Sequence, residues 1–180
     1  MVQDFFKNKK ITVGILAFCL LVLVILREHI VFLLLLAIIM FDKCFFARIN
    51  VIGGIEFVTI SVMIVTLKYG LITGFVFCTF IAVLPGIVNT IIGYRWVASP
   101  SFKSFSFSIG NIRDYLSVVI IDLLKNTNLY IIMLALLLFK NFFKPEGIQP
   151  MDYITIPINF LFNLSIVFFF YDFWIYLINF

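Results

Sequence analysis

Residues 50–93 read NVIGGIEFVTISVMIVTLKYGLITGFVFCTFIAVLPGIVNTIIG, which is two apolar runs separated by one short polar turn. The first run extends from Val51 to Leu67 and the second from Leu71 to Ile92, with Lys68-Tyr69-Gly70 between them. At a helical rise of about 1.5 Å per residue, each run is about long enough to cross a hydrocarbon core roughly 30 Å thick. The stretch therefore predicts a transmembrane helical hairpin.

The composition of the whole chain agrees with a membrane protein. Of 180 residues, 64% are hydrophobic and 12% are charged, whereas soluble domains are about 45–50% apolar and about 25% charged. The net charge of +4 does not indicate nucleic-acid binding, because the Lys and Arg residues flank apolar runs and form no basic stripe. We expect residues 1–180 to form a single transmembrane domain in a lipid bilayer.

Further apolar runs on either side of the hairpin predict an all-α bundle of about six transmembrane helices. These runs are Ile11–Leu26, Ile30–Met40, Arg113–Phe139 and Tyr153–Ile178. The run Ile30–Met40 is short. It either continues through Asp42-Lys43 to Ala47 or forms a partial, tilted helix.

The run Arg113–Phe139 also allows two interpretations. Polar residues recur in it at helical spacing, which favours one long tilted helix with a polar stripe turned inward. The alternative is an interfacial helix that breaks near Asn126. The connection before this run, Tyr94–Ile112, nearly alternates Ser and Phe, which suits an extended segment, and Lys140–Pro150 is interpreted as a short loop.

Orientation follows from the placement of Lys and Arg, because short basic segments resist translocation. With six crossings and the N-terminus inside, the inner segments hold twice as many assigned Lys and Arg residues as the outer segments. The sequence therefore predicts a multi-pass protein of the cell membrane with both termini in the cytoplasm.

No pattern in the sequence marks an enzyme. There is no phosphate-binding glycine loop, no dinucleotide-binding fingerprint and no zinc-protease helix. His29 is the one histidine, and the three cysteines have no metal-ligand spacing. We therefore expect no catalytic residue, no metal site and no cofactor.

Polar side chains inside the apolar runs are the candidates for ligand binding. An ionisable group at membrane depth costs several kcal/mol unless it faces the bundle interior, forms a pair or is protonated. Glu56 has no neutralising neighbour one turn away, whereas Asp122 has Lys125 as a possible partner. A structural ion pair or an interhelical hydrogen bond is the alternative role for each candidate. The candidates are Glu56, Asn89, Asp122, Asn159 and Asn163.

Two glycines at the start of the second hairpin arm, Gly70 and Gly74, have the spacing Gly-x-x-x-Gly. Residues without a Cβ atom let two helices approach closely in a membrane. The pair is therefore predicted to serve helix packing.

The hairpin also resembles a known family. The order Ile55-Glu56-Phe57-Val58-Thr59-Ile60, then Lys68-Tyr69-Gly70-Leu71-Ile72-Thr73-Gly74, then Pro85-Gly86, resembles the S components of energy-coupling-factor transporters. The asparagines of the last run, Asn159 and Asn163, look like those of the final helix of S components. The six-helix plan is also similar to MreD, a membrane scaffold protein. Unlike S components, the first run carries no Ala-x-x-x-Ala pattern.

The resemblance implies two functions. In the first, the chain captures a small-molecule substrate between its helices near the outer face, for an uptake transporter. Its partners would be a membrane coupling subunit and ATPases, since the chain has no ATP site of its own. In the second, the chain is a non-transporting scaffold of the MreD type that recruits other membrane proteins. The first function expects a polar, water-accessible cavity near Glu56, and the second expects a filled bundle.

Overall fold

The computed structural model describes residues 29–46, 55–92, 109–143 and 152–180. The chain separates into two compact units, Met1–Leu34 and Leu35–Phe180, and the boundary falls inside helix α3 (Ile30–Phe41). The regular elements among the described residues are all helices, so the predicted all-α class is confirmed. Two stretches, Leu71–Val88 and Asp152–Phe169, are long and apolar enough to span a membrane.

The predicted hairpin is present, and its turn is where the sequence indicated. Helix α5 (Val58–Tyr69) ends at Gly70, and α6 (Leu71–Ile92) begins at the next residue. Gly70 has a φ angle of +87°, and its N–H donates to the Thr66 carbonyl at 2.9 Å. Such a left-handed conformation favours glycine because other residues meet a steric penalty there.

The first arm of the hairpin starts later than predicted. Residues 55–57 are not helical and α5 begins at Val58, while the earlier part of the predicted run, residues 51–54, lies outside the described residues. The Phe57 N–H, which has no partner within the helix at this end, donates to Asp42 Oδ2 at 3.4 Å. Glu56 therefore precedes the helix.

Asp42 belongs to the π-helix η2 (Asp42–Phe46), which follows α3 directly. Of the two interpretations of the short run Ile30–Met40, the continuation through Asp42-Lys43 is thus the one observed.

The single long helix predicted for Arg113–Phe139 is wrong. The chain forms two helices that pack against each other, α7 (Ile109–Leu124) and α8 (Leu129–Phe142). The break between them lies near Asn126, where the alternative interpretation placed it. The Asn128 side chain accepts a hydrogen bond from the Tyr130 N–H at 2.9 Å and caps α8. The extended segment predicted for Tyr94–Ile112 lies outside the described residues up to 108, and its last residues belong to α7.

The last apolar run is also interrupted, at Phe170. It forms α9 (Asp152–Phe169) and the shorter α10 (Tyr171–Asn179). Lys68 Nζ at the end of α5 donates to the Ile178 carbonyl at 3.3 Å. Helix α10 therefore lies at the end of the bundle where the α5–α6 turn is.

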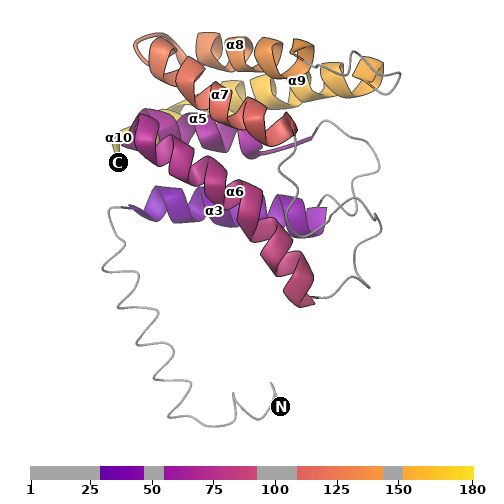
Figure 1. The fold of residues 1–180 in the computed structure, drawn as a ribbon. Coiled ribbons are helices and arrows are strands. Elements are labelled where there is room, and N and C mark those ends of the chain that lie inside the picture. The colour runs from indigo at the N-terminus through magenta and orange to yellow at the C-terminus, as the bar shows by residue number, and fades with distance from the viewer. Residues whose placement is uncertain (1–28, 47–54, 93–108, 144–151) are drawn as a thin grey trace. The chain divides into compact units, whose positions relative to one another are not determined.

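Helix α5 is the centre of the unit Leu35–Phe180. It packs against α6, α7, α8 and α10, and every residue from Val58 to Thr66 is buried. Figure 1 shows α5 among these helices, with α8 and α9 side by side. A helix that is apolar on all sides is expected at such a position.

Candidate functional site

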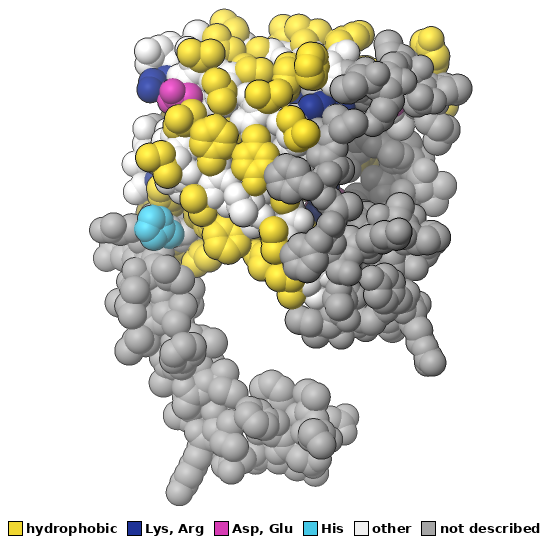
Figure 2. Space-filling model, in the orientation of Figure 1, with side chains coloured by type: hydrophobic (Ala, Val, Ile, Leu, Met, Phe, Trp, Pro, Cys, Tyr) yellow, Lys and Arg dark blue, Asp and Glu magenta, His cyan; other side chains and the backbone are white. Residues whose placement is uncertain are grey.

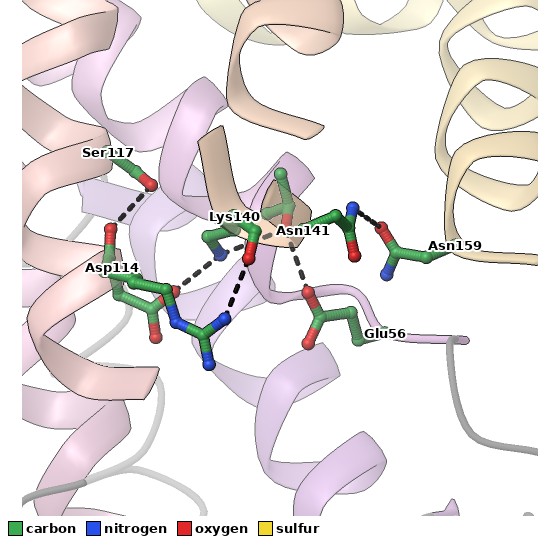
Figure 3. Close-up of polar contacts among 8 residues, drawn as sticks. Glu56, Asp114, Ser117, Lys140, Asn141 and Asn159 are labelled. Carbon is green, nitrogen blue, oxygen red and sulfur yellow. Dashed lines mark hydrogen bonds and ion pairs between the residues drawn. The ribbon is translucent and has the colours of Figure 1, made fainter. Parts of the chain in front are cut away.

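Charged and amide side chains meet at the end of the bundle where α5 and α7 begin and α8 ends (Figure 3). Glu56 immediately precedes α5, Asp114 lies in the second turn of α7, and Lys140 lies in the last turn of α8. Asn159 joins them from α9. We call Glu56, Thr59, Asp114, Lys140 and Asn159 the polar cluster.

Lys140 is the central residue of the polar cluster. Its Nζ lies 2.6 Å from Asp114 Oδ1 and donates to Thr59 Oγ1 at 3.0 Å. Thr59 Oγ1 in turn donates to Glu56 Oε1 at 3.1 Å. One ammonium group is thus connected to two carboxylates, to one directly and to the other through a hydroxyl.

The backbone around Lys140 is held by its neighbours on α7. Arg113 donates from its guanidinium to the Lys140 carbonyl at 2.8 Å. This carbonyl lies near the C-terminus of α8, where a cation is favourable and where the carbonyls lack helical partners. Ser117 Oγ donates to the Arg113 carbonyl at 2.7 Å.

Amide side chains extend the polar cluster toward α9. Asn141 Nδ2 donates to Asn159 Oδ1 at 3.3 Å, and Asn159 also forms a hydrogen bond with Glu56. One turn deeper, Asn163 Nδ2 donates to the Asn159 carbonyl at 3.0 Å. Asn141, Asn159 and Asn163 are all buried.

The pKa values of two acids at this end, Glu56 and Asp42, are shifted in opposite directions. Both acids lie outside the two candidate membrane spans. Burial alone would raise the pKa of Glu56, but the positive charges of Lys140 and Lys43 and the hydrogen bonds from Thr59 and Asn159 lower it below its usual value. For Asp42, burial dominates over the Phe57 hydrogen bond and raises the pKa. The surroundings therefore favour an ionised Glu56.

The structure brings together three of the five predicted ligand-binding residues. Glu56, Asn159 and Asn163 lie in or next to the polar cluster. Asp122 instead pairs with Lys125 at 3.1 Å, and both side chains are exposed, at 34% and 56% respectively. The backbone of Asn89 lies in α6, and its side chain is outside the described residues.

The two glycines of the predicted packing pair differ. A Cβ atom at Gly74 would lie 2.5 Å from Thr66 Oγ1 and 2.9 Å from Val118 Cγ1, so the site has no room for one. A Cβ atom at Gly70 would meet nothing within 4 Å. Gly74 therefore permits the close approach of α5, α6 and α7, whereas Gly70 serves the turn.

Sequence reasoning missed three members of the polar cluster, Thr59, Asp114 and Lys140. Thr59 is a helical neighbour of Glu56 at i+3, but it carries no charge and was not counted as a neutralising partner, and Lys140 was assigned to a loop. A usable signal was present. Asp114 and Lys140 lie at nearly equal distances on either side of Asn126-Thr127-Asn128, so a helical hairpin at that polar turn places them at the same end.

The polar cluster offers carboxylate acceptors and ammonium and amide donors within one region, so it can bind a polar or charged group of either sign. No set of three or more potential metal ligands occurs in the part of the chain that the structure describes. No family model, curated protein or solved structure matches this chain.

Proposed function

We propose that the chain is a multi-pass protein of the cell membrane that binds a small polar solute at the polar cluster, as the substrate-capture subunit of a transporter. The observation that carries this proposal is the meeting of Glu56, Asp114 and Lys140, from three separate parts of the chain, at one end of an otherwise apolar bundle. Intramembrane ionisable groups are costly, and they commonly mark the binding sites and pathways of solutes.

The outward faces of the helices support a membrane location. Large apolar residues are exposed on α6, α7 and α8 at helical spacing, and Figure 2 shows hydrophobic side chains over most of the described surface on one side. Soluble monomers rarely expose contiguous apolar patches larger than a few hundred Å². The exposed residues include Ile72, Val76 and Phe80 on α6, Ile112, Leu116, Val119 and Leu123 on α7, and Ile131, Leu134 and Leu138 on α8.

The solute that fits best carries both a cationic and an anionic or hydroxyl group. Glu56 is held by two neutral donors, Thr59 and Asn159, and by the more distant charge of Lys140. A ligand ammonium would therefore gain a carboxylate partner at Glu56. Lys140 would provide the complementary donor for a ligand carboxylate or hydroxyl.

The distribution of Lys and Arg suggests which end of the bundle is cytoplasmic. Lys43, Arg113 and Lys140 lie at the end with the polar cluster, whereas Lys68 and Lys125 lie at the opposite end. The positive-inside rule then orients the polar cluster toward the cytoplasm. A solute taken up from outside would be held at the release end of the bundle.

On this orientation the C-terminus lies outside, whereas the single-helix interpretation put it in the cytoplasm. The difference arises because the break between α7 and α8 adds one reversal of direction. Single-cysteine variants of cysteine-free protein, with cysteine at Lys43 and at Asn179, should label from opposite sides of the membrane. Labelling of both from the same side would contradict the orientation.

A scaffold of the MreD type is the second candidate, and one observation favours it. Asp114 and Lys140 satisfy each other at 2.6 Å, and a mutually paired cluster can serve as a structural link between helices without any ligand. The exposed apolar faces would then contact partner helices as well as lipid.

The two candidates are distinguished by what accompanies the protein through purification. We expect a small molecule to be retained in detergent and to be identifiable by mass spectrometry. The variant Glu56→Gln should fold and lose that molecule, because it keeps the hydrogen bonds and removes the charge. The matched control Asp122→Asn removes an exposed acid on α7 and should retain it.

The opposite pattern supports the scaffold. Co-purifying proteins without any small molecule, and a Glu56→Gln variant that retains those proteins, would exclude capture of a solute at the polar cluster.

A further inference from the structure

Two fully buried polar atoms next to the polar cluster have no hydrogen-bond partner among the residues that the structure describes. They are Ser61 Oγ on α5 and Asn163 Oδ1 on α9, and both residues are 0% exposed. Leaving such atoms unpaired forfeits their hydration without compensation, which is why buried polar groups nearly always have partners. Two unpaired atoms in one region therefore indicate a group that binds there.

Contacts between α9 and the two residues that precede α5 indicate that these atoms lie near each other. Glu56 forms a hydrogen bond with Asn159, and the Phe57 ring packs edge-on against Phe162 with centroids 5.3 Å apart. Ser61 is one helical turn beyond Phe57 on the same face of α5. Asn163 is one turn beyond Asn159, on the buried face of α9.

We propose that Ser61 and Asn163 form a buried subsite, one helical turn deeper than Glu56, that binds a hydrogen-bond donor. Asn163 Nδ2 already donates to the Asn159 carbonyl. The Oδ1 atom of the same amide is an acceptor, so its missing partner is a donor. Ser61 Oγ can accept from the same group or donate to it. A hydroxyl group between them satisfies both atoms by donating to Asn163 Oδ1 and accepting from Ser61 Oγ, and an amino group does so by donating to each.

The shared chemistry of the occupant is a small hydroxyl or amino group, and it has two possible sources. One source is an internal water molecule, which typically makes about three hydrogen bonds in a buried site. The other is the hydroxyl or amino group of the captured solute, whose charged part would lie at Glu56. In this second form the inference rests on the proposed function.

A double-mutant cycle tests the subsite without knowledge of the solute. Ser61→Ala and Asn163→Leu each leave the occupant with one partner fewer, so each should lower the melting temperature in detergent by about 2–4 °C. In the double variant the occupant has already lost its contact with Asn163, so adding Ser61→Ala should lower the melting temperature little further than Asn163→Leu alone. The two effects should therefore be strongly non-additive.

The control pairs Asn163→Leu with Ser117→Ala. Ser117 is an equally buried serine whose Oγ donates within its own helix, to the Arg113 carbonyl, so its effect should add to that of Asn163→Leu. The loss of the Asn163 donor to Asn159 is common to both cycles and cancels. If Ser61→Ala and Asn163→Leu instead raise the melting temperature and act additively, the atoms are unoccupied and the subsite is excluded.

Exhaustive exchange of the unmodified protein into buffered detergent without other small molecules distinguishes the two sources. A melting temperature that does not change identifies an internal water, and the subsite then stands even if no solute is captured at Glu56. If the melting temperature of the unmodified protein falls on exchange, toward that of Ser61→Ala or Asn163→Leu, the occupant is a group of the solute. In that case the double variant should show no change on exchange.

Discussion

Helix α7 carries two acid–lysine pairs that differ in their surroundings. Asp114 pairs with Lys140 of α8 at 2.6 Å, and the two side chains are 16% and 10% exposed. Asp122 pairs with Lys125, three residues further along the chain and just after the end of α7, at 3.1 Å, with exposures of 34% and 56%. The same two residue types thus form a nearly buried link between helices and an exposed pair at a helix end.

The difference in burial determines which of the two ion pairs can take part in binding a ligand. An exposed pair between neighbouring residues forms and breaks in contact with polar surroundings at little cost, so it contributes about 0–1 kcal/mol. A buried pair has lost its hydration and depends on further partners, here Thr59 and the Arg113 contact to the Lys140 backbone. Only the buried pair can exchange its internal partners for those of a ligand with a large change in energy.

Removal of the two lysines is the strongest test of this comparison. Lys140→Met should lower the free energy of unfolding by about 3–5 kcal/mol, because it removes the ammonium group that pairs with Asp114 and is linked to Glu56 through Thr59. Lys125→Met should change it by less than about 1 kcal/mol. Both are measured by titration with a denaturing detergent, followed by circular dichroism.

Equal effects of the two substitutions would remove the distinction between the pairs. A small effect of Lys140→Met would mean that the end of the bundle with the polar cluster is hydrated, and that Asp114 finds its compensation in water.

Gly74 tests the packing that positions the buried pair. Val118, which a Cβ atom at Gly74 would approach to 2.9 Å, lies on α7 midway between Asp114 and Asp122. Gly74→Leu should cost about 1–3 kcal/mol, because a side chain there forces α7 away from α6. The loss should appear as a lower melting temperature in detergent.

Two nearby substitutions calibrate this result. Leu71→Ile in the same turn should have a negligible effect, and Gly70→Ala should cost about 1 kcal/mol from its positive φ angle alone. A tolerated Gly74→Leu would mean that α7 is free to move outward, and the buried pair would then not depend on this contact.

The sequence was sufficient to predict the all-helical class and the turn at Gly70, because an apolar run interrupted by a charge, an aromatic residue and a glycine has few other structures. It was not sufficient for the break between α7 and α8. Apolar residues predominate on both sides of Asn126, and the polar residues continue at helical spacing across the break. The helical spacing of the polar residues outweighed the local signal of a break, which is the run of four polar residues Lys125-Asn126-Thr127-Asn128.

The missed break also explains why the polar cluster was only partly predicted. Glu56, Asn159 and Asn163 stood out because each is polar in an apolar run. Lys140 is unremarkable in the sequence, and its role depends on the return of α8 toward the start of α7. A contact between residues 26 positions apart follows from the topology, which no local property of Lys140 reveals.

Coupling energies provide a finer test of the same comparison. In a double-mutant cycle with Asp114→Asn and Lys140→Met, the second substitution should be partly compensated by the first, with a coupling of about 0.5–3 kcal/mol. The cycle with Asp122→Asn and Lys125→Met should give about 0.3–0.5 kcal/mol, the value for neighbouring pairs on exposed helices. Similar couplings in both cycles would show that burial does not distinguish the pairs.

The smallest expected effect is a pH dependence set by the acids around Lys140. The pKa of Glu56 is lowered in the folded state, so its stabilising contribution is complete above the unfolded value of about 4.3 and is lost as the pH falls through the folded pKa. Glu56→Gln should therefore flatten the acid limb of the stability–pH curve. The exposed acid Asp122, changed to Asn, provides the matched comparison.

Asp42 should act with the opposite sign at the same end of the bundle. Its folded pKa is raised, so the folded state binds a proton more readily than the unfolded state, and Asp42 opposes folding at neutral pH. Asp42→Asn keeps an acceptor for the Phe57 N–H and removes the buried charge. It should raise stability at pH 7 and steepen the loss of stability on the acid side, because the compensating proton uptake by the folded state is gone. Melting temperatures of Asp42→Asn and Glu56→Gln, measured from pH 3 to pH 8, check this. If both substitutions shift the curve in the same direction, Lys140 does not distinguish Glu56 from Asp42.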